Sequence, residues 1–165
     1  MTEDLGQFLK NLKGRNLALK MEAVLELGRL KDKSAVPALV EALADPEIRA
    51  LACWALGRIG EKTTAPRILV LLADKDPLVR HEAVLALARI RDGRAAKPLA
   101  KLLHLDPVEK VREECAEALA VFPSKMAVSA LKKAAESDPS KLVRERANRS
   151  LVQLRLKELG IIQPL

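Results

Sequence analysis

The sequence predicts an all-α fold, an α-solenoid of about five helix-turn-helix repeats that together form one domain over residues 1–165. Three observations carry this prediction. Apolar residues follow the three- and four-residue spacing of helices throughout the chain, and no alternating strand pattern occurs. A motif also recurs about every 30 residues, a period typical of solenoid proteins. Its basic residues are Lys20, Arg49, Arg80, Arg112 and Arg144.

The first helical pair is expected over residues 4–30. Its first helix, over residues 4–13, carries Leu5, Phe8 and Leu12 on one face, as an amphipathic helix does. A loop that contains glycine and asparagine then leads into the second helix. This pair lacks the full motif and is a degenerate first copy.

The next four pairs follow the same plan. The first helix of three of them has a proline in its first turn, where the missing N–H costs nothing. An Asp-Pro pair stands before each second helix, and its aspartate is expected to be the N-cap. Gly60, Gly93 and Gly160 are expected to end helices in the left-handed conformation. The four pairs are predicted over residues 34–60, 63–91, 94–122 and 124–160.

Composition narrows the class of protein. The net charge of +7 permits an acidic partner, including nucleic acid. One Trp, two Phe and no Tyr argue against binding of single strands by stacked aromatic side chains. No apolar run is long enough to cross a membrane, and the N-terminus shows no secretion signal. Cys53 and Cys115 occupy equivalent positions two repeats apart, beyond the reach of a disulfide. Reduced thiols and a cytoplasmic location are therefore expected.

The motif at residues 45–60 and 76–90 resembles the HEAT-like repeats of the phycobilin-lyase type. The resemblance covers nearly the whole chain. It implies a right-handed solenoid in which the second helix of each pair lines the concave side. It also implies a structural ladder between basic side chains and loop aspartates. The ladder would join Arg49, Arg80, Arg112 and Arg144 to Asp45, Asp76, Asp106 and Asp138.

Two enzyme groups share such repeats. Deoxyhypusine hydroxylases build a di-iron site from His-Glu pairs in several repeats, whereas here His81-Glu82 is the only such pair. Bilin lyases act as paired subunits, and no motif in this chain locates their functional residues. We therefore expect a protein that is not an enzyme, with no catalytic residue, metal or cofactor. A lyase-like subunit and a metal-dependent activity at His81-Glu82 remain the alternatives.

The candidate binding surface follows from counting positions in each second helix from its basic residue, taken as zero. Positions 2, 5 and 9 share one face because they are three and four residues apart. An apolar strip centred on the single Trp and bordered by arginines has the composition of a protein interface. The predicted partner-binding residues are Leu25, Arg29, Leu51, Trp54, Arg58, His81, Glu82, Leu85, Arg89, Glu114, Glu117, Arg146 and Arg149.

The predicted partner is a helix or extended segment of another protein, lying on the concave surface of a scaffold. Two alternatives stay open. Trp54 could instead be a core residue, buried between neighbouring second helices by strong curvature. The basic last helix could bind nucleic acid, or it could simply be the polar cap that the end of a solenoid needs.

Overall fold

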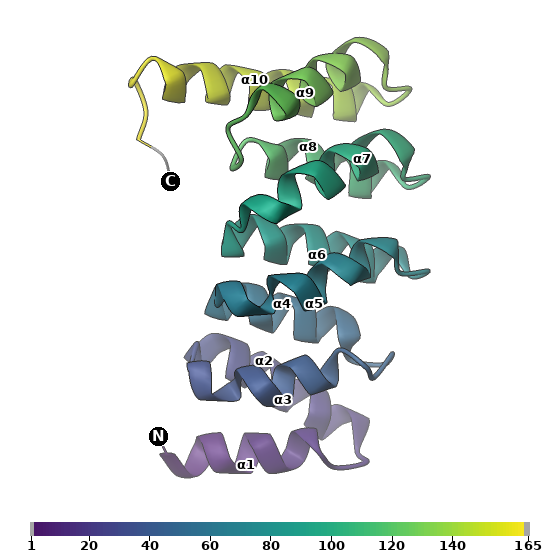
Figure 1. The fold of residues 1–165 in the computed structure, drawn as a ribbon. Coiled ribbons are helices and arrows are strands. Elements are labelled where there is room, and N and C mark those ends of the chain that lie inside the picture. Colours follow the sequence, from purple (N-terminus) through teal and green to yellow (C-terminus); the bar gives the residue numbers. More distant parts are fainter. Residues whose placement is uncertain (1, 164–165) are drawn as a thin grey trace. The chain divides into compact units, whose positions relative to one another are not determined.

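The computed structural model describes the chain over residues 2–163, with side chains from residue 5 onward. Ten α-helices and four short 3-10 helices follow one another in this range, and it contains no strand. The helices form two compact units, residues 1–90 and 91–165. The all-α prediction is confirmed, and Figure 1 shows the helices arranged in pairs along the chain.

The first unit contains three helical pairs. The second helices, α2, α4 and α6, pack side by side, α2 on α4 and α4 on α6. In Figure 1, α3 and α5 lie in front of this layer. The elements are α1 (Thr2–Leu12), α2 (Leu17–Leu30), η1 (Lys33–Ala35), α3 (Val36–Ala42), α4 (Arg49–Ile59), η2 (Lys62–Thr64), α5 (Ala65–Val70), η3 (Leu71–Ala73) and α6 (Pro77–Ile90).

The second unit contains two pairs built in the same way. Its first helices pack on each other, α7 on α9, and its second helices do the same, α8 on α10. The elements are η4 (Gly93–Ala95), α7 (Ala96–Leu105), α8 (Glu109–Leu119), α9 (Lys125–Ser137) and α10 (Lys141–Glu158). No helix in the described part of the chain is long and apolar enough to cross a membrane.

Position 7 of the second helix is the centre of the core. Leu27, Leu56 and Leu87 occupy it in the first unit and Leu119 in the second, and these four side chains are fully buried. Leu151, at the same position of α10, is half-buried. Burying one such side chain contributes about 1.5–3 kcal/mol, so this one column of leucines is a main source of stability in both units.

Small residues let the second helices of the first unit approach closely. A Cβ added at Gly28 of α2 would lie 3.0 Å from the Cα of Ala55, and one added at Gly57 of α4 would lie 2.6 Å from the Cα of Ala86. Both glycines occupy position 8, and both alanines occupy position 6 of the next second helix. The absence of side chains at position 8 therefore sets the distance between layers.

Ion pairs join successive repeats within each unit. Lys20, Arg49 and Arg112 each contact an aspartate of the following repeat, and in the third repeat this aspartate is Asp74 rather than the Asp76 of the expected ladder. The pairs are Lys20 Nζ to Asp45 at 2.7 Å, Arg49 Nη1 to Asp74 at 2.7 Å, and Arg112 Nε and Nη2 to Asp138 at 2.9 and 3.0 Å.

The arginines of the ladder also donate hydrogen bonds to backbone carbonyls six residues earlier. Arg49 Nε lies 2.7 Å from the carbonyl oxygen of Leu43, and Arg144 Nη1 lies 2.7 Å from that of Asp138. Arg80 and Arg112 make the equivalent bonds. Carbonyls at helix C-termini lack partners within their own helix, so these side chains are structural, as the resemblance implies.

The Asp-Pro pairs begin a helix in only one case. Asp76 and Pro77 stand at the start of α6, as predicted. All four aspartates accept a hydrogen bond from the N–H two residues later, at 2.8–3.0 Å. Helices α4, α8 and α10 nevertheless start three or more residues after Asp45, Asp106 and Asp138, so these three predicted N-caps lie in turns of the preceding loops.

The helix ends agree with the prediction at two of three glycines. Gly60 and Gly160 have φ angles of 75° and 69°, the left-handed conformation. Gly93 was predicted wrongly, since it begins the 3-10 helix η4. The left-handed residue after α6 is Arg91 with φ 57°, and Lys31 with φ 55° follows α2 in the same way.

Candidate functional site

Nine of the residues at positions 2, 5 and 9 belong to α2, α4 and α6, which pack as one layer in the first unit. We call them the second-helix face. Position 5 supplies an apolar row, position 9 a row of arginines, and position 2 two glutamates and a leucine. The residues are Glu22, Leu25, Arg29, Leu51, Trp54, Arg58, Glu82, Leu85 and Arg89.

Trp54 lies at the centre of this face and is half-buried. Its Cζ3 atom would be 2.5 Å from a Cβ at Gly28, so the ring packs against the bare backbone of α2. The guanidinium carbon of Arg58 lies 5.7 Å from the ring centroid, within the range of a cation–π contact. The indole is therefore packed against the protein on one side and accessible to solvent on another. It is neither a fully buried core residue nor a fully exposed surface residue.

Leu25 and Leu85 continue the apolar row on either side of Trp54. Leu25 is 38% exposed, and Leu85 is half-buried. Leu51 is half-buried at position 2 of α4. The row is thus a shallow apolar strip that the fold leaves in contact with solvent over three repeats.

Arginines border the strip along its full length. Arg29, Arg58 and Arg89 are all exposed. Arg29 pairs with the carboxylate of Glu26 on its own helix, at 3.5 Å. Arg58 contacts Trp54, and within residues 5–163 Arg89 shows no hydrogen bond or ion pair. Most of the positive charge in this row is therefore not neutralised within the unit.

His81 and Glu82 lie at the edge of the strip, on α6. His81 Nδ1 is 3.4 Å from Glu82 Oε1, and both side chains are about four-fifths buried. Burial raises the pKa of the Cys53 thiol to about 12, and the charge of Glu82 contributes to the rise. No three His, Cys, Asp or Glu side chains in the described part of the chain are grouped as metal ligands would be.

The four predicted residues of the second unit are arranged differently from the expectation. Arg146 of α10 donates to Glu117 at 2.6 Å and to Glu113 at 2.8 Å, both on α8. Arg146 and Glu117 thus neutralise each other within the unit, whereas they were predicted to set the register of a partner. Glu114 is half-buried, and Arg149 is exposed. The sequence did not reveal that Glu113 completes this cluster.

The basic last helix is partly engaged within its own unit. Lys157 Nζ donates to the carbonyl oxygen of Ala120 at 3.0 Å. Burial lowers the pKa of Lys157, and the nearby charge of Arg91 lowers it further. Arg155 pairs with Glu158 at 3.1 Å on the surface. This part of α10 therefore contributes less free positive charge than its sequence indicates.

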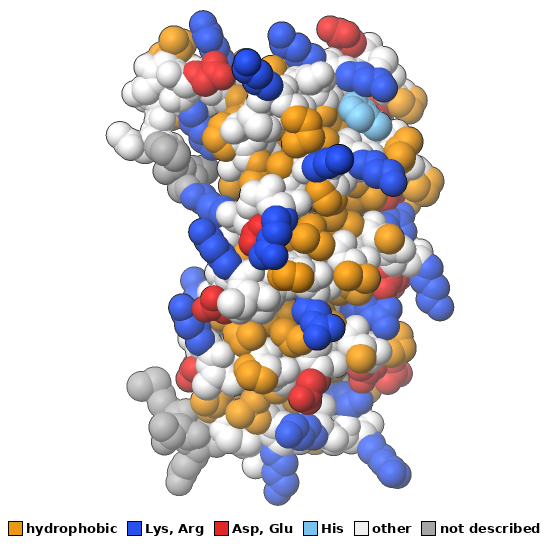
Figure 2. Space-filling view, in the orientation of Figure 1, with side chains coloured by type: hydrophobic (Ala, Val, Ile, Leu, Met, Phe, Trp, Pro, Cys, Tyr) orange, Lys and Arg blue, Asp and Glu red, His pale blue; other side chains and the backbone are white. Residues whose placement is uncertain are grey.

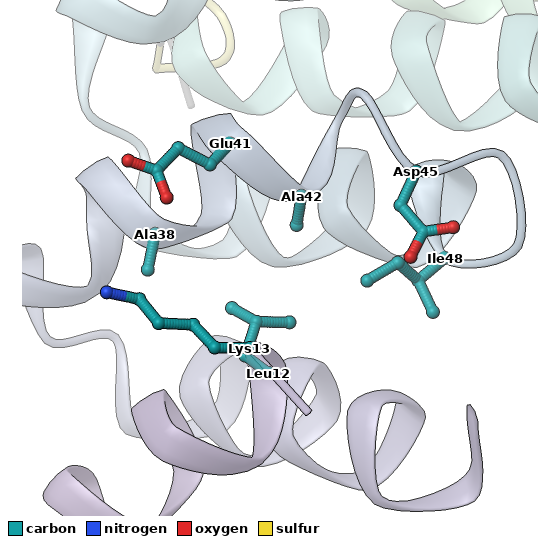
Figure 3. Close-up of a pocket in the computed structure, with 7 residues that line it drawn as sticks. All are labelled: Leu12, Lys13, Ala38, Glu41, Ala42, Asp45 and Ile48. Carbon is teal, nitrogen blue, oxygen red and sulfur yellow. The ribbon is translucent and has the colours of Figure 1, made fainter. Parts of the chain in front are cut away.

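A hollow of about 260 Å³ lies elsewhere in the first unit. Figure 3 shows the end of α1 below it, α3 above it, and the loop before α4 at one side. Its lining mixes aliphatic side chains with one lysine and two acidic residues, and contains neither histidine nor cysteine. The lining residues are Leu12, Lys13, Ala38, Glu41, Ala42, Asp45 and Ile48.

Apolar side chains also reach the surface outside the strip. Figure 2 views the first unit from the side of α3 and α5 and shows hydrophobic side chains between charged ones. Val70 of α5, for example, is 72% exposed. Exposed apolar area alone therefore does not mark the site. What distinguishes the second-helix face is an anchored indole beside a row of arginines.

Two family models match the chain. The model described as HEAT repeats matches residues 44–120, and the one described as PBS lyase HEAT-like repeat matches residues 19–45. No protein of curated function matches the chain significantly in sequence.

Solved structures of helical repeat proteins resemble the chain. A chain in the complex of CpcE and CpcF of phycocyanin lyase from Nostoc sp. PCC7120 is 27% identical, with a TM-score of 0.80, and the match covers 94% of this chain and 66% of that one. A designed armadillo repeat protein in complex with the peptide (KR)4 is 22% identical, with a TM-score of 0.65 and coverages of 96% and 91%. Human deoxyhypusine hydroxylase is 20% identical, with a TM-score of 0.52 and coverages of 92% and 84%. The solenoid class is thereby confirmed.

Proposed function

Because this chain belongs to the HEAT-repeat proteins, we propose that it is a protein-interaction module whose second-helix face binds a segment of another protein. One observation carries the proposal: Trp54 is half-buried at the centre of a three-repeat apolar strip and is covered on one side by Arg58. Trp and Arg are among the residues enriched at the energetic centres of protein interfaces.

The face is also prepared for binding before a partner arrives. Gly28 and Gly57 hold the three helices at fixed close distances, and the ladder ties successive repeats together. A rigid surface loses little conformational entropy when it binds. This rigidity supports a role in recognising a partner.

Two of the similar structures contain partners, which supports the proposal by analogy of fold. One is a complex of the two phycocyanin lyase subunits CpcE and CpcF, and the other is a repeat protein with a bound peptide. The similarity to a lyase chain also favours a second candidate function, that of a subunit in a lyase-like enzyme. This chain spans 66% of the length of that lyase chain.

The buried cysteines bear on the proposed location. Cys53 and Cys115 are both free thiols in the interior. Burial raises the pKa of each thiol, and that of Cys115 lies well above its usual value. Free thiols are typical of reducing compartments, which supports the proposal that the protein acts in the cytoplasm.

The test compares partner capture by the intact protein with capture by Arg58→Glu and Arg89→Glu variants, followed by calorimetric titration of each purified partner. We expect both variants to bind the partner at least about tenfold more weakly, the equivalent of 1.4 kcal/mol. Trp54→Ala is less suitable, because the indole packs on Gly28 and its removal also lowers stability.

Arg67→Glu is the matched control. Arg67 is exposed on α5, away from the second-helix face, and the change in charge is the same. The proposal requires that this variant bind normally. If Arg67→Glu and Arg58→Glu lose the same affinity for the partner, the loss is a general effect of net charge. If Arg58→Glu and Arg89→Glu bind the partner normally, the second-helix face is not the binding surface.

A further inference from the structure

We infer that the partner of the second-helix face is an acidic amphipathic α-helix that crosses α2, α4 and α6 and presents one carboxylate to each layer. This inference rests on the proposed function and adds the chemistry and geometry of the bound segment.

The charge of the partner follows from the arginine row. Arg29, Arg58 and Arg89 stand one per repeat at the same position of adjacent helices and are all exposed. The side chain of Arg29 is 71% exposed despite its neighbour Glu26. The equivalent residues of the second unit are Val121 and Gln153. The row is therefore a local feature of the first unit, and carboxylates are its complement.

The other regularly spaced arginines do not offer such a site. Arg49 is bonded to Asp74 and to two backbone carbonyls, and Arg112 is bonded twice to Asp138. Their donors are used to hold the repeats together. Position 9 differs because the side chains of its three arginines are exposed.

The spacing of the layers favours a helix over an extended segment. Packed helices lie about 8–10 Å apart, and a helix advances about 10.5 Å in seven residues, at about 1.5 Å per residue. Seven residues are nearly two full turns, so carboxylates at i, i+7 and i+14 stay on one side and meet successive layers. An extended chain covers the same distance in about three residues, which places successive side chains on opposite sides.

The apolar row fixes how such a helix is oriented. Leu25, Trp54 and Leu85 lie four positions before the arginines in each helix, so the apolar stripe of the bound helix rests on them while its acidic flank faces the arginines. Glu22 and Glu82 border the opposite edge. Because reversing a helix end for end exchanges its two flanks, this arrangement of charges also selects one direction of binding.

The test uses two synthetic helical peptides of three heptads, with leucines on one face and either glutamate or lysine at every seventh position beside it. Neither peptide contains Trp. The protein has a single Trp and no Tyr, so its emission reports on Trp54 alone. We expect the glutamate peptide to change this emission saturably, more weakly as salt is added, and the lysine peptide to have no effect.

Charge-reversal variants test whether the peptide binds at the arginine row. We expect an Arg58→Glu/Arg89→Glu double variant to bind the glutamate peptide at least tenfold more weakly than the wild-type protein does, and to bind the lysine peptide. Arg67→Glu should bind both peptides as the wild-type protein does. Urea unfolding of each variant confirms that it is folded. Reversal of peptide preference is a result that loss of structure could not produce.

Three outcomes would overturn the inference. Equal binding of both peptides would refute the acidic character of the partner. It would leave the proposed function intact, because the face would still bind a helix. If neither peptide binds, the inference that the partner is a helix is refuted. The proposed function would then be tested by the titration of the captured partner alone. Tighter binding of a duplex oligonucleotide than of the glutamate peptide, lost in the same double variant, would assign the arginine row to phosphates.

Discussion

Gly28 and Gly57 are the residues at which neighbouring second helices come closest. A methyl group at Gly28 would meet both the indole of Trp54 and the backbone of Ala55, and one at Gly57 would meet the backbone of Ala86. Backbone atoms cannot move aside as a flexible side chain can. The same two contacts therefore decide the packing of the first unit and the position of Trp54 on the second-helix face.

We predict that Gly28→Ala and Gly57→Ala each lower the free energy of unfolding by about 1–3 kcal/mol, the usual cost of overpacking. Gly6→Ala in α1 is the matched control, because no atom lies within 4 Å of its added Cβ. That variant should gain up to about 1 kcal/mol from the better helix propensity of alanine. Urea unfolding of the three variants measures these changes, and a neutral Gly57→Ala would contradict the close approach.

Lys31 and Arg91 adopt the left-handed conformation in which Gly60 ends α4. This conformation costs a residue with a Cβ about 1–2 kcal/mol. We predict that Lys31→Gly and Arg91→Gly each raise the free energy of unfolding by about 0.5–1 kcal/mol, part of the gain being offset by the freedom of glycine in the unfolded chain. Gly60→Ala should lower it. Thermal unfolding measures whether stability rises in Lys31→Gly and Arg91→Gly and falls in Gly60→Ala. A loss of stability in Lys31→Gly would refute the idea that the left-handed conformation is costly there.

Some of these residues could be identified from sequence, and others could not. The glycines at 60 and 160 follow the usual rule for helix ends, whereas nothing in the sequence marks Lys31 or Arg91 as left-handed. Gly28 and Gly57 stand inside helices, where their role depends on what the next helix places opposite them. That information arises only when the layers are packed.

At the scale of the element, the loops between paired helices carry the charges that join the repeats. Hydrogen bonds lower the pKa of Asp45, from Lys20 foremost and then from the N–H of Glu47. The N–H of Asp76 and then Arg49 lower that of Asp74 against the effect of burial. A lowered pKa in the folded state means that the charged carboxylate is favoured by folding.

We predict that Asp74→Asn lowers the free energy of unfolding by about 1.5–3 kcal/mol near neutral pH, the usual value of hydrogen bonds to a charged group. The control is Asp76→Asn in the same loop, where the side chain accepts the N–H of Leu78 and Asn caps a helix equally well. The control should leave the free energy of unfolding nearly unchanged. Unfolding in urea compares the two variants.

The same pair of variants predicts a pH dependence. The contribution of Asp74 is fully present above the unfolded pKa of about 3.9 and is lost as the pH falls through the lower pKa of the folded state. The difference in stability between wild type and Asp74→Asn should therefore shrink below about pH 4. A difference that stays constant from pH 7 down to pH 2 would show that the charge of Asp74 contributes nothing.

Sequence patterns located the elements well and their ends less well. Helix α6 begins where its Asp-Pro pair predicts, because Pro77 is its first residue. At Asp45, Asp106 and Asp138 the same two residue types lie in a turn before the helix, although all four aspartates accept the N–H two residues later. The carboxylates of Asp45 and Asp138 are also paired with basic side chains of the preceding repeat, and local sequence does not contain that pairing.

At the scale of the whole molecule, periodicity predicts the class of fold because each repeat must bury the same face against its neighbours. It predicts the binding face less completely. Positions 2, 5 and 9 in the first unit form a strip with unneutralised arginines, but in the second unit the same positions bring Arg146 against Glu117. Equivalent positions thus serve different purposes, and side-chain pairing across layers decides which.

The most direct measurement is the ¹⁹F NMR spectrum of the protein with 5-fluorotryptophan incorporated, titrated with a purified partner obtained by capture. A single Trp gives a single resonance. The resonance of Trp54 should shift saturably with the partner and respond at least tenfold more weakly in Arg58→Glu, while Arg67→Glu behaves as wild type. A resonance that does not move when the partner is bound to saturation would place the binding surface elsewhere.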